Sequence, residues 1–450
     1  MTAGAAGATA TAAAEAATAT NAGGRLEEQH TLTELGSGIR VVTEPLPSVR
    51  SIAVGLWVRV GSRNEQPTEA GISHFLEHML FKGTPKLTAE QIAQTFDGFG
   101  AEVNAATGKE TTVLHAHFLD EHLDEAFEVL GDMLLRSTWP DLESEREVVL
   151  EEIAMYEDEP QDKVHDILAR AIFGDHPLGR PVIGRGEVIS KLAKDDVASY
   201  HDNRYVPPAI VVAAAGNLEH GRIQELAEKY LQNDRDGERP TFTPPEPKQP
   251  SVLFHQKDTE QYHLCVGGRG LARNDDRRFA LAILDGLLGG SSSSRLFQEV
   301  REKRGLAYSV YSWSSQYTDT GHVGVYVGTR EDNVEKALDV IAAELRRVCE
   351  EEVGAEELNR AREHVKGRLA LSMESTASRM YRLGRSVLME TPLMSLDETI
   401  ERLEAVDATQ IMALAREFYP PEQLSAAGVG REESRFRAAL APLGPELAAA

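Results

Sequence analysis

The sequence predicts an α+β fold made of two homologous domains, each a mainly antiparallel sheet covered by helices. Three observations lead to this prediction. The chain has 450 residues, more than one hydrophobic core usually organises. Prolines interspersed with charged residues mark an extended linker within Asn233–Ser251. The segments on either side of this linker resemble one another, which indicates a duplicated unit.

The repeat is visible in two pairs of segments at similar offsets. Val54–Glu65 (VGLWVRVGSRNE) matches Leu264–Asp275 (LCVGGRGLARND) at an offset of 210, and His74–Gly83 (HFLEHMLFKG) matches Leu281–Gly290 (LAILDGLLGG) at 207. Tyr205-Val206-Pro207-Pro208 is echoed by Tyr419-Pro420-Pro421. We expect a first domain at 28–235, a linker at 236–250 and a second domain at 251–435. The flanking segments are expected to be tails, an Ala/Thr-rich disordered one at 1–27 and another at 436–450.

Periodicity predicts the elements of the first copy in turn. Arg40–Glu44 is expected to form a strand, and the alternating apolar residues from Ile52 to Val60 a second one. Residues 101–118 are expected to form a hairpin that turns through Thr107–Glu110. Helical patterns fill about 120–200, and Ala209–Ala215 predicts a further strand.

Composition narrows the class of protein. A formal net charge of −25 disfavours nucleic acid and anionic membranes as partners. Two distant cysteines, Cys265 and Cys349, exclude a disulfide framework and favour a reducing compartment. Residues 1–24 contain no Lys or Arg, so neither a signal peptide nor a mitochondrial presequence is expected. No later stretch is long and apolar enough to span a membrane, so we expect a cytoplasmic protein.

The segment His74-Phe75-Leu76-Glu77-His78 carries the strongest chemical signal. On a helix, histidines four residues apart lie on one face one turn apart, and Glu77 projects near them. Two neutral imidazoles at that separation can share a zinc ion, and a neighbouring carboxylate can take a proton from water. The alternative is a pair of histidines on a solvated face. The apolar neighbours of the motif favour the metal, because buried ionisable groups need partners.

The repeat offers a test of that alternative. In the second copy, Leu281, Leu284 and Asp285 stand where His74, Glu77 and His78 stand in the first. A motif needed only for packing would be expected in both copies. Its presence in one copy favours a chemical role.

A catalytic zinc ion needs a third protein ligand, and an acidic helix at Glu145–Tyr156 can supply it. Helical spacing puts Glu145, Val148, Val149, Glu152 and Tyr156 on one stripe, which we expect to be the buried one. Glu152 would then be a buried carboxylate that needs a partner. Glu145 could hydrogen-bond to a metal ligand and orient it. The alternative is that both are ordinary surface acids.

The motif, the stretch Val148–Ile153 and the duplicated architecture resemble the insulinase–pitrilysin (inverzincin) metallopeptidase family. The likeness extends from about Gly38 to Gly430 and is greatest to its mitochondrial-processing-peptidase-like branch, in particular bacterial zinc proteases. The resemblance implies one Zn²⁺ per chain held by His74, His78 and Glu152. It also implies Glu77 as general base and Glu145 as an additional acid. The 74-residue separation of His78 from Glu152 is slightly short for the family.

Two further stretches match the family. Gly98–Ala105 resembles the edge strand to which a substrate peptide adds, so Asn104 and Ala105 would bind substrate, although Asn104 could equally be a polar turn residue. Arg301 and Tyr308 have the seven-residue spacing of an Arg and Tyr pair that reaches the substrate and its oxyanion from the second domain.

The resemblance implies a zinc metalloendopeptidase that hydrolyses peptides or unfolded polypeptide segments. Its two domains would form a half-shell, and two half-shells would enclose a chamber, as a homodimer or as a heterodimer with a homologous subunit. The alternative within the family is a non-catalytic subunit that binds peptides or supports assembly. Such subunits usually lack the histidines or the glutamate of the motif. A structural zinc protein would need four closed ligands, often with Cys, and neither cysteine is near the motif.

Overall fold

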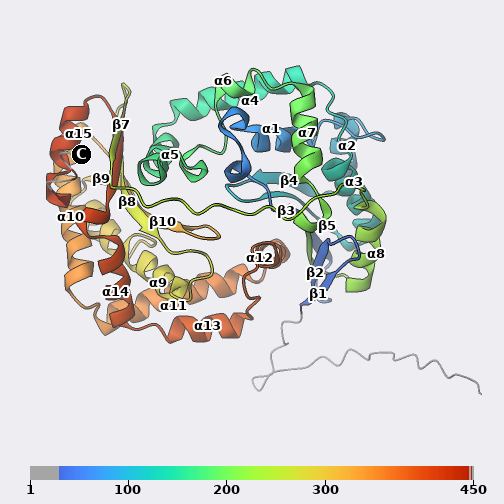
Figure 1. Cartoon of the computed structure of the whole chain (residues 1–450). Coiled ribbons are helices and arrows are strands. Elements are labelled where there is room, and N and C mark those ends of the chain that lie inside the picture. Colours follow the sequence, from blue (N-terminus) through green and yellow to red (C-terminus); the bar gives the residue numbers. More distant parts are fainter. Residues whose placement is uncertain (1–29, 445–446, 448–450) are drawn as a thin grey trace, which may run out of the picture.

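Two sheets, each with its own helices, make up the chain, and they lie side by side (Figure 1). The structure is a computed structural model that describes residues 30–444 and residue 447. The first sheet has the strand order β1-β2-β6-β3-β5-β4 and the second has the order β7-β11-β8-β10-β9. This arrangement confirms the α+β class and the division into two similar units.

The strands of the first sheet are β1 (Thr31–Glu34), β2 (Arg40–Pro45), β3 (Ser51–Val58), β4 (Glu102–Thr107), β5 (Thr112–Leu119) and β6 (Ile210–Gly216). Those of the second are β7 (Val252–Gln256), β8 (Tyr262–Gly270), β9 (Ala307–Gln316), β10 (Gly321–Thr329) and β11 (Ser425–Gly430). In each sheet one parallel pair, β2 with β6 and β7 with β11, is followed by antiparallel pairs only. Apart from β1, the two sheets therefore have the same order and the same strand directions, which confirms the duplication.

Helices follow the same plan in both halves. The first half carries α1 (Ile72–Met79), α2 (Ala89–Gly98), α3 (Leu123–Leu135), α4 (Leu142–Asp158), α5 (Pro160–Phe173), α6 (Gly186–Ile189), α7 (Lys194–Arg204) and α8 (His220–Tyr230). The second carries α9 (Arg278–Leu288), α10 (Val334–Glu350), α11 (Ala355–Ser372), α12 (Thr376–Leu388), α13 (Leu396–Glu404), α14 (Ala408–Phe418) and α15 (Glu433–Ala439). Since α1 follows β3 and α9 follows β8, these two helices occupy equivalent places.

Both faces of the first sheet are buried, which explains why β3 is almost wholly apolar. Val54, Leu56 and Val58 face the main core of the first half, together with α1 and α3. Ala53 and Trp57 point to the opposite face, where they meet α12. The predicted hairpin and strands are confirmed within one or two residues at their ends.

In each half, one helix packs on the sheet of the other half. Met380, Leu383 and Val387 of α12 pack on the first sheet, although α12 belongs to the second half. In return, Val164 and Leu168 of α5 pack against the second sheet around Cys265 and Tyr326. Figure 1 shows α12 beside β2 and α5 beside β8. The exchange ties the two sheets together without a shared sheet.

The predicted linker is extended, since residues 232–251 contain no helix or strand. Its Phe242 lies against the guanidinium groups of Arg59 and Arg63, at 5.5 and 4.8 Å from the ring centre. The helix α15 crosses the expected end of the second domain and buries Phe436. The exact domain limits stay predictions, and the tail expected at 1–27 lies outside the described residues. No helix in the described part of the chain is long and apolar enough to cross a membrane.

Candidate metal centre

The helix α1 is fixed at its start by a glycine and a buried carboxylate. Gly71 has φ +100°, and a Cβ there would lie 2.8 Å from the Cα of Gly184, so only glycine fits. Glu65 accepts hydrogen bonds from the backbone N–H groups of Gly71 (2.8 Å) and Ser73 (3.0 Å). A carboxylate at a helix N-terminus stabilises the helix, although burial raises the pKa of Glu65 to about 7. These contacts set the position from which His74, one residue on, enters the site.

His74 and His78 converge on Glu152 from α4. The Nε2 atom of His74 lies 3.7 Å from Glu152 Oε1, and that of His78 lies 3.2 Å from Glu152 Oε2. The ligand atoms of all three lie within 4.8 Å of one another. In residues 30–444 and 447, this is the one group of three or more His, Cys, Asp or Glu side chains placed to hold a metal ion. Two imidazoles and a carboxylate form a donor set suited to zinc.

The electrostatics of the group fit a cation. Burial, with a smaller effect of His78, lowers the pKa of His74 to about 4, so its imidazole is neutral at pH 7 as a ligand must be. Burial also raises the pKa of Glu77, and the neighbouring Thr107 partly opposes this rise. His74 Nδ1 and Glu77 Oε2 are buried without a hydrogen-bond partner. Buried polar atoms are usually paired, so two unpaired ones beside three possible ligands are compatible with a bound ion or water.

Glu145 lies behind His78. Its Oε1 is 2.8 Å from His78 Nδ1, and its Oε2 is 2.5 Å from Lys82 Nζ. A carboxylate at Nδ1 keeps the proton on that nitrogen and leaves Nε2 free to bind a metal. Lys82 was not singled out from the sequence, although its spacing of four residues from His78 was a usable signal.

The expectation of a uniformly buried stripe on α4 is wrong. Glu145 and Val149 are buried, but Val148 is 51% exposed and the Glu152 side chain is 44% exposed. The physical reason is that α1 covers only one part of α4. Glu152 therefore faces α1 from a partly solvent-exposed position and is not enclosed in a core.

The predicted substrate strand is an edge strand. β4 pairs with β5 on one side and ends the sheet, so its other side carries no strand. Asn104 is exposed, and its Oδ1 accepts a hydrogen bond from the backbone N–H of Ala105 at 2.8 Å. Thr107, at the end of β4, contacts Glu77 and so joins this edge to the metal group.

Arg301 and Tyr308 are brought together by the structure. The Arg301 guanidinium lies over the Tyr308 ring, 4.4 Å from its centre, and donates to the Tyr308 carbonyl oxygen at 3.1 Å. The Tyr308 side chain is strongly exposed. Within the described residues, no hydrogen bond or ion pair joins either of them to His74, Glu77, His78 or Glu152.

The two halves of the chain match two sequence models of one peptidase family. The sequence model described as "Insulinase (Peptidase family M16)" matches residues 40–186, and that described as "Peptidase M16 inactive domain" matches 191–365. The chain belongs to the M16 peptidase family. An uncharacterized zinc protease of Bacillus subtilis is 42% identical over 85% of this chain and 94% of its own length. Another, from Streptomyces coelicolor, is 42% identical over 86% of each chain.

Solved structures show the same M16 fold. A protein from Pseudomonas fluorescens described as a peptidase M16 inactive domain has a TM-score of 0.85 at 20% identity, and the match covers 90% of this chain and 98% of that one. A protease from Helicobacter pylori has a TM-score of 0.83 at 23% identity, with 90% and 99% covered. At these identities the likeness concerns the fold.

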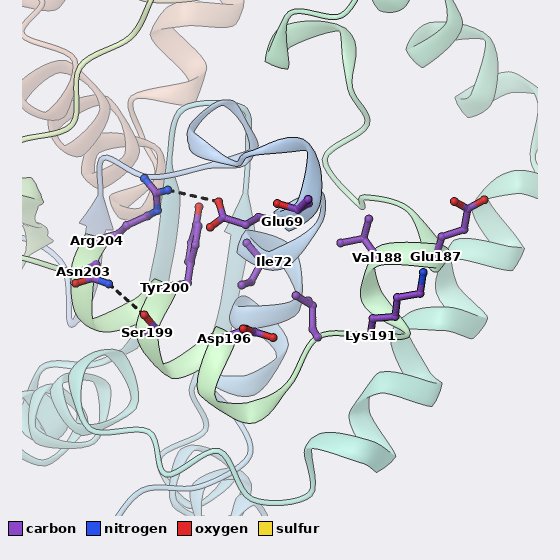
Figure 2. Close-up of a pocket in the computed structure, with 12 residues that line it drawn as sticks. Glu69, Ile72, Glu187, Val188, Lys191, Asp196, Ser199, Tyr200, Asn203 and Arg204 are labelled. Atoms are coloured by element: carbon purple, nitrogen blue, oxygen red, sulfur yellow. Dashed lines mark hydrogen bonds and ion pairs between the residues drawn. The ribbon is translucent and has the colours of Figure 1, made fainter.

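A large cavity elsewhere on this M16 chain is not part of the metal group. It measures about 780 Å³ and lies between α6, α7 and the start of α1 (Figure 2). Four of its polar side chains form two pairs, Glu69 with Arg204 at 3.5 Å and Ser199 with Asn203 at 3.2 Å. Tyr200, in its wall, is hydrogen-bonded to Ser73 at 2.8 Å and so supports α1.

Proposed function

We propose that this M16 chain is a zinc-dependent endopeptidase with one Zn²⁺ held by His74, His78 and Glu152. The observation that carries the proposal is the convergence of three ligand atoms within 4.8 Å beside a buried, unpartnered carboxylate oxygen of Glu77. The curated names of its relatives, which describe zinc proteases, support it. A carboxylate that only stabilised the fold would have its oxygens paired inside the protein.

The chemistry is hydrolysis of a peptide bond. When bound, zinc supplies Lewis acidity, which polarises the carbonyl of the cleaved bond and makes water more acidic. Glu77 then takes a proton from the attacking water and delivers it to the leaving amine. Burial raises the pKa of Glu77, which makes its carboxylate a stronger acceptor for the proton of the water. Glu145 holds His78 in the tautomer that can bind the metal.

The other predicted residues have roles in binding in this proposal. A substrate peptide adds to the free side of β4. There the Ala105 N–H, which now donates to Asn104 Oδ1, donates instead to a carbonyl oxygen of the peptide. Arg301 and Tyr308 stabilise the oxyanion or hold the substrate from the second half. Two such chains, or this chain and a homologous subunit, enclose a chamber that admits peptides and unfolded segments. A cytoplasmic location is supported by two unpaired cysteines, Cys265 and Cys349.

The test compares Glu77→Gln with the parent. Both proteins are loaded with zinc, their metal content is measured, and cleavage of a mixed peptide library is mapped by mass spectrometry. Glu77→Gln is expected to keep zinc and to lose cleavage, because Glu77 is not a ligand. Glu147→Gln, an exposed acid on α4, is the matched control and is expected to behave like the parent. Equal cleavage by Glu77→Gln would remove Glu77 from the mechanism, and a zinc-loaded parent that binds but cleaves nothing would be a non-catalytic subunit.

A further inference from the structure

A second cavity lies where the end of β4 meets the second half of the chain. It measures about 630 Å³, and its walls include Ala106 and Thr107 of β4, Trp57 of β3, Gln316 of β9, and Tyr381 and Arg385 of α12. The indole of Trp57 meets the Tyr381 ring edge-on, at 5.2 Å between centres. Thr107 is the residue that contacts Glu77. The cavity therefore begins beside the proposed general base.

The charges that line this cavity are unbalanced. Lys109, Arg273 and Arg385 contribute positive charge, whereas Glu110 is the one acidic residue among the lining residues. The whole chain carries a formal charge of −25, so the positive charge of this cavity is opposite in sign to that of the protein as a whole. The excess positive charge favours an anionic group as its occupant.

Glu110 cannot balance all of this charge, because its one carboxylate is shared between Arg63, which lies outside the lining, and Arg273. Its Oε1 accepts from Arg63 Nη1 at 2.6 Å and from the Thr318 N–H at 3.0 Å. Its Oε2 accepts from the Thr318 hydroxyl at 3.1 Å and from Arg273 Nη2 at 3.3 Å. Lys109, in turn, donates to the carbonyl oxygen of Arg180.

Arg273 and Arg385 keep unused hydrogen-bond capacity. Arg273 Nε is buried without an acceptor. Among the described residues, the Arg385 side chain forms no hydrogen bond or ion pair, and it is exposed. Burial and then the charge of Arg385 lower the pKa of Arg273 to about 10, so the two guanidinium groups are close enough to repel each other. An anion between them would remove this repulsion and supply the missing acceptor.

We propose that this cavity binds a carboxylate of the peptide substrate through Arg385, with Arg273 beside it, and so makes the enzyme select acidic residues near the cleaved bond. The inference rests on the proposed function, since it names the substrate class of the same site. Arg385 is a specificity residue in this account, and it takes no part in bond cleavage.

Strand geometry brings a substrate side chain to this cavity. Along β4, successive side chains point to opposite faces of the sheet. Ala105 faces the main core, whereas Ala106 lines the cavity on the other face. A peptide that pairs with β4 also alternates, so one of its side chains close to Thr107 points to the face that carries Trp57, Tyr381 and Arg385. A glutamate or aspartate there would reach the guanidinium groups, as would the terminal carboxylate of a peptide that ends nearby.

The experiment uses pairs of quenched fluorescent peptides, blocked at both ends, in which one residue near the cleaved bond is Glu or Gln. The zinc-loaded parent is expected to cleave the best Glu peptide with a kcat/KM about tenfold above its Gln partner, because a charge-assisted hydrogen bond is gained. Arg385→Gln is expected to remove this preference and keep its zinc. Arg385→Glu is expected to reverse it, so that the Gln peptide is cleaved faster than its Glu partner. Arg360→Gln, which removes an arginine from the exposed side of α11, is the matched control and is expected to keep it.

Binding separates this inference from the proposed function. Anisotropy of the same peptides on zinc-loaded Glu77→Gln reports the carboxylate preference without cleavage, and Glu77→Gln/Arg385→Gln is expected to lose it. A preference in binding with no cleavage by the parent would support the pocket and overturn the peptidase proposal. Cleavage with equal rates for Glu and Gln peptides, unchanged by Arg385→Gln, would overturn the pocket and leave the peptidase. If blocked peptides show no preference but unblocked versions of them bind more tightly, and Arg385→Gln removes this gain, the selection of acidic side chains is overturned and the cavity binds the C-terminal carboxylate.

Discussion

The helices α1 and α9 occupy equivalent places in the two halves. They differ in whether their buried polar atoms have hydrogen-bond partners. In α9, Leu281 and Leu284 are buried in the second core, and the Asp285 carboxylate accepts a hydrogen bond from the Ser312 hydroxyl. No buried side-chain nitrogen or oxygen atom of α9 lacks a hydrogen-bond partner. In α1, the corresponding positions hold His74, Glu77 and His78, and His74 Nδ1 and Glu77 Oε2 are buried without partners.

The difference shows what each copy is for. A helix that only packs on a sheet needs apolar side chains and a few satisfied polar ones, as in α9. The first copy keeps ionisable groups partly buried and unsatisfied at a cost in stability, which is expected where a metal and a substrate complete the set. The second copy contributes instead α12, which covers the first sheet and lines the proposed carboxylate pocket.

The largest effect is expected when the third zinc ligand of the first copy is removed. Glu152→Gln is expected to lose zinc on dialysis and all cleavage, because two imidazoles alone hold the ion weakly. Its neighbour Glu151 is exposed and lies about 100° further around the helix. Glu151→Gln is therefore expected to keep zinc and activity. Metal analysis of both variants decides, and the opposite pattern would mean that the helix presents the other carboxylate.

The contribution of the second half can be tested through Arg301 and Tyr308. Arg301→Ala and Tyr308→Phe are each expected to lower kcat by about 100-fold, as loss of an oxyanion donor does, with zinc content unchanged. Steady-state kinetics on a single good peptide measures this. If neither variant alters cleavage of any peptide, the second half supplies no group to the reaction.

A smaller effect is expected from the residue behind His78. Glu145→Gln removes the charge that faces His78 Nδ1 and Lys82 Nζ. The zinc dissociation constant is expected to rise about tenfold, because a weaker partner orients the ligand less firmly. Competition with a chelator measures the affinity. An unchanged constant would show that Glu145 serves only to pair with Lys82.

The buried His201 of the first copy predicts an effect of pH on stability. Tyr205 and Tyr419 directly follow α7 and α14, so His201 of α7 corresponds to Ala415 of α14, and both residues are buried. His201 Nε2 bonds to the Leu134 carbonyl oxygen at 2.8 Å, and burial lowers its pKa to about 4. The unfolded imidazole takes up its proton near pH 6.5, so the unfolded state binds more protons between pH 6.5 and 4. Stability is therefore lost as the pH falls through this range.

The size of this effect can be measured by urea unfolding of the metal-free protein. From pH 7 to pH 5 the free energy of unfolding is expected to fall by about 2 kcal/mol on account of His201. The His201→Gln variant is expected to have a lower free energy of unfolding at pH 7. Between pH 7 and pH 5 its free energy of unfolding is expected to fall by about 2 kcal/mol less than that of the parent. Equal pH slopes for the two proteins would show that folding does not lower the pKa of His201.

The parts of the molecule that follow from local pattern were predictable from the sequence. The alternation in β3, the turn between β4 and β5 and the helical spacing of His74 and His78 are all local. The choice of Glu152 over Glu151 depends on helix phase, which is also local. The exposure of Val148 was not predictable, because the pattern of α4 does not show how far α1 extends over it.

Long-range packing accounts for what the sequence did not reveal. The apolar faces of α5 and α12 are visible in the sequence, but nothing local shows that each covers the sheet of the other half. The contact of Thr107 with Glu77 depends on where β4 meets α1. Arg385 became a candidate only once the fold placed it beside Arg273, more than one hundred residues earlier in the chain.

The central claim is that α1 differs from α9 because it holds a metal, and exchanging their residues tests it directly. A variant carrying His74→Leu, Glu77→Leu and His78→Asp gives the first copy the residues of the second. Zinc per chain is measured after dialysis, with circular dichroism to verify the fold. The account predicts one zinc ion in the parent and none in the folded variant. Equal zinc in both proteins would contradict it.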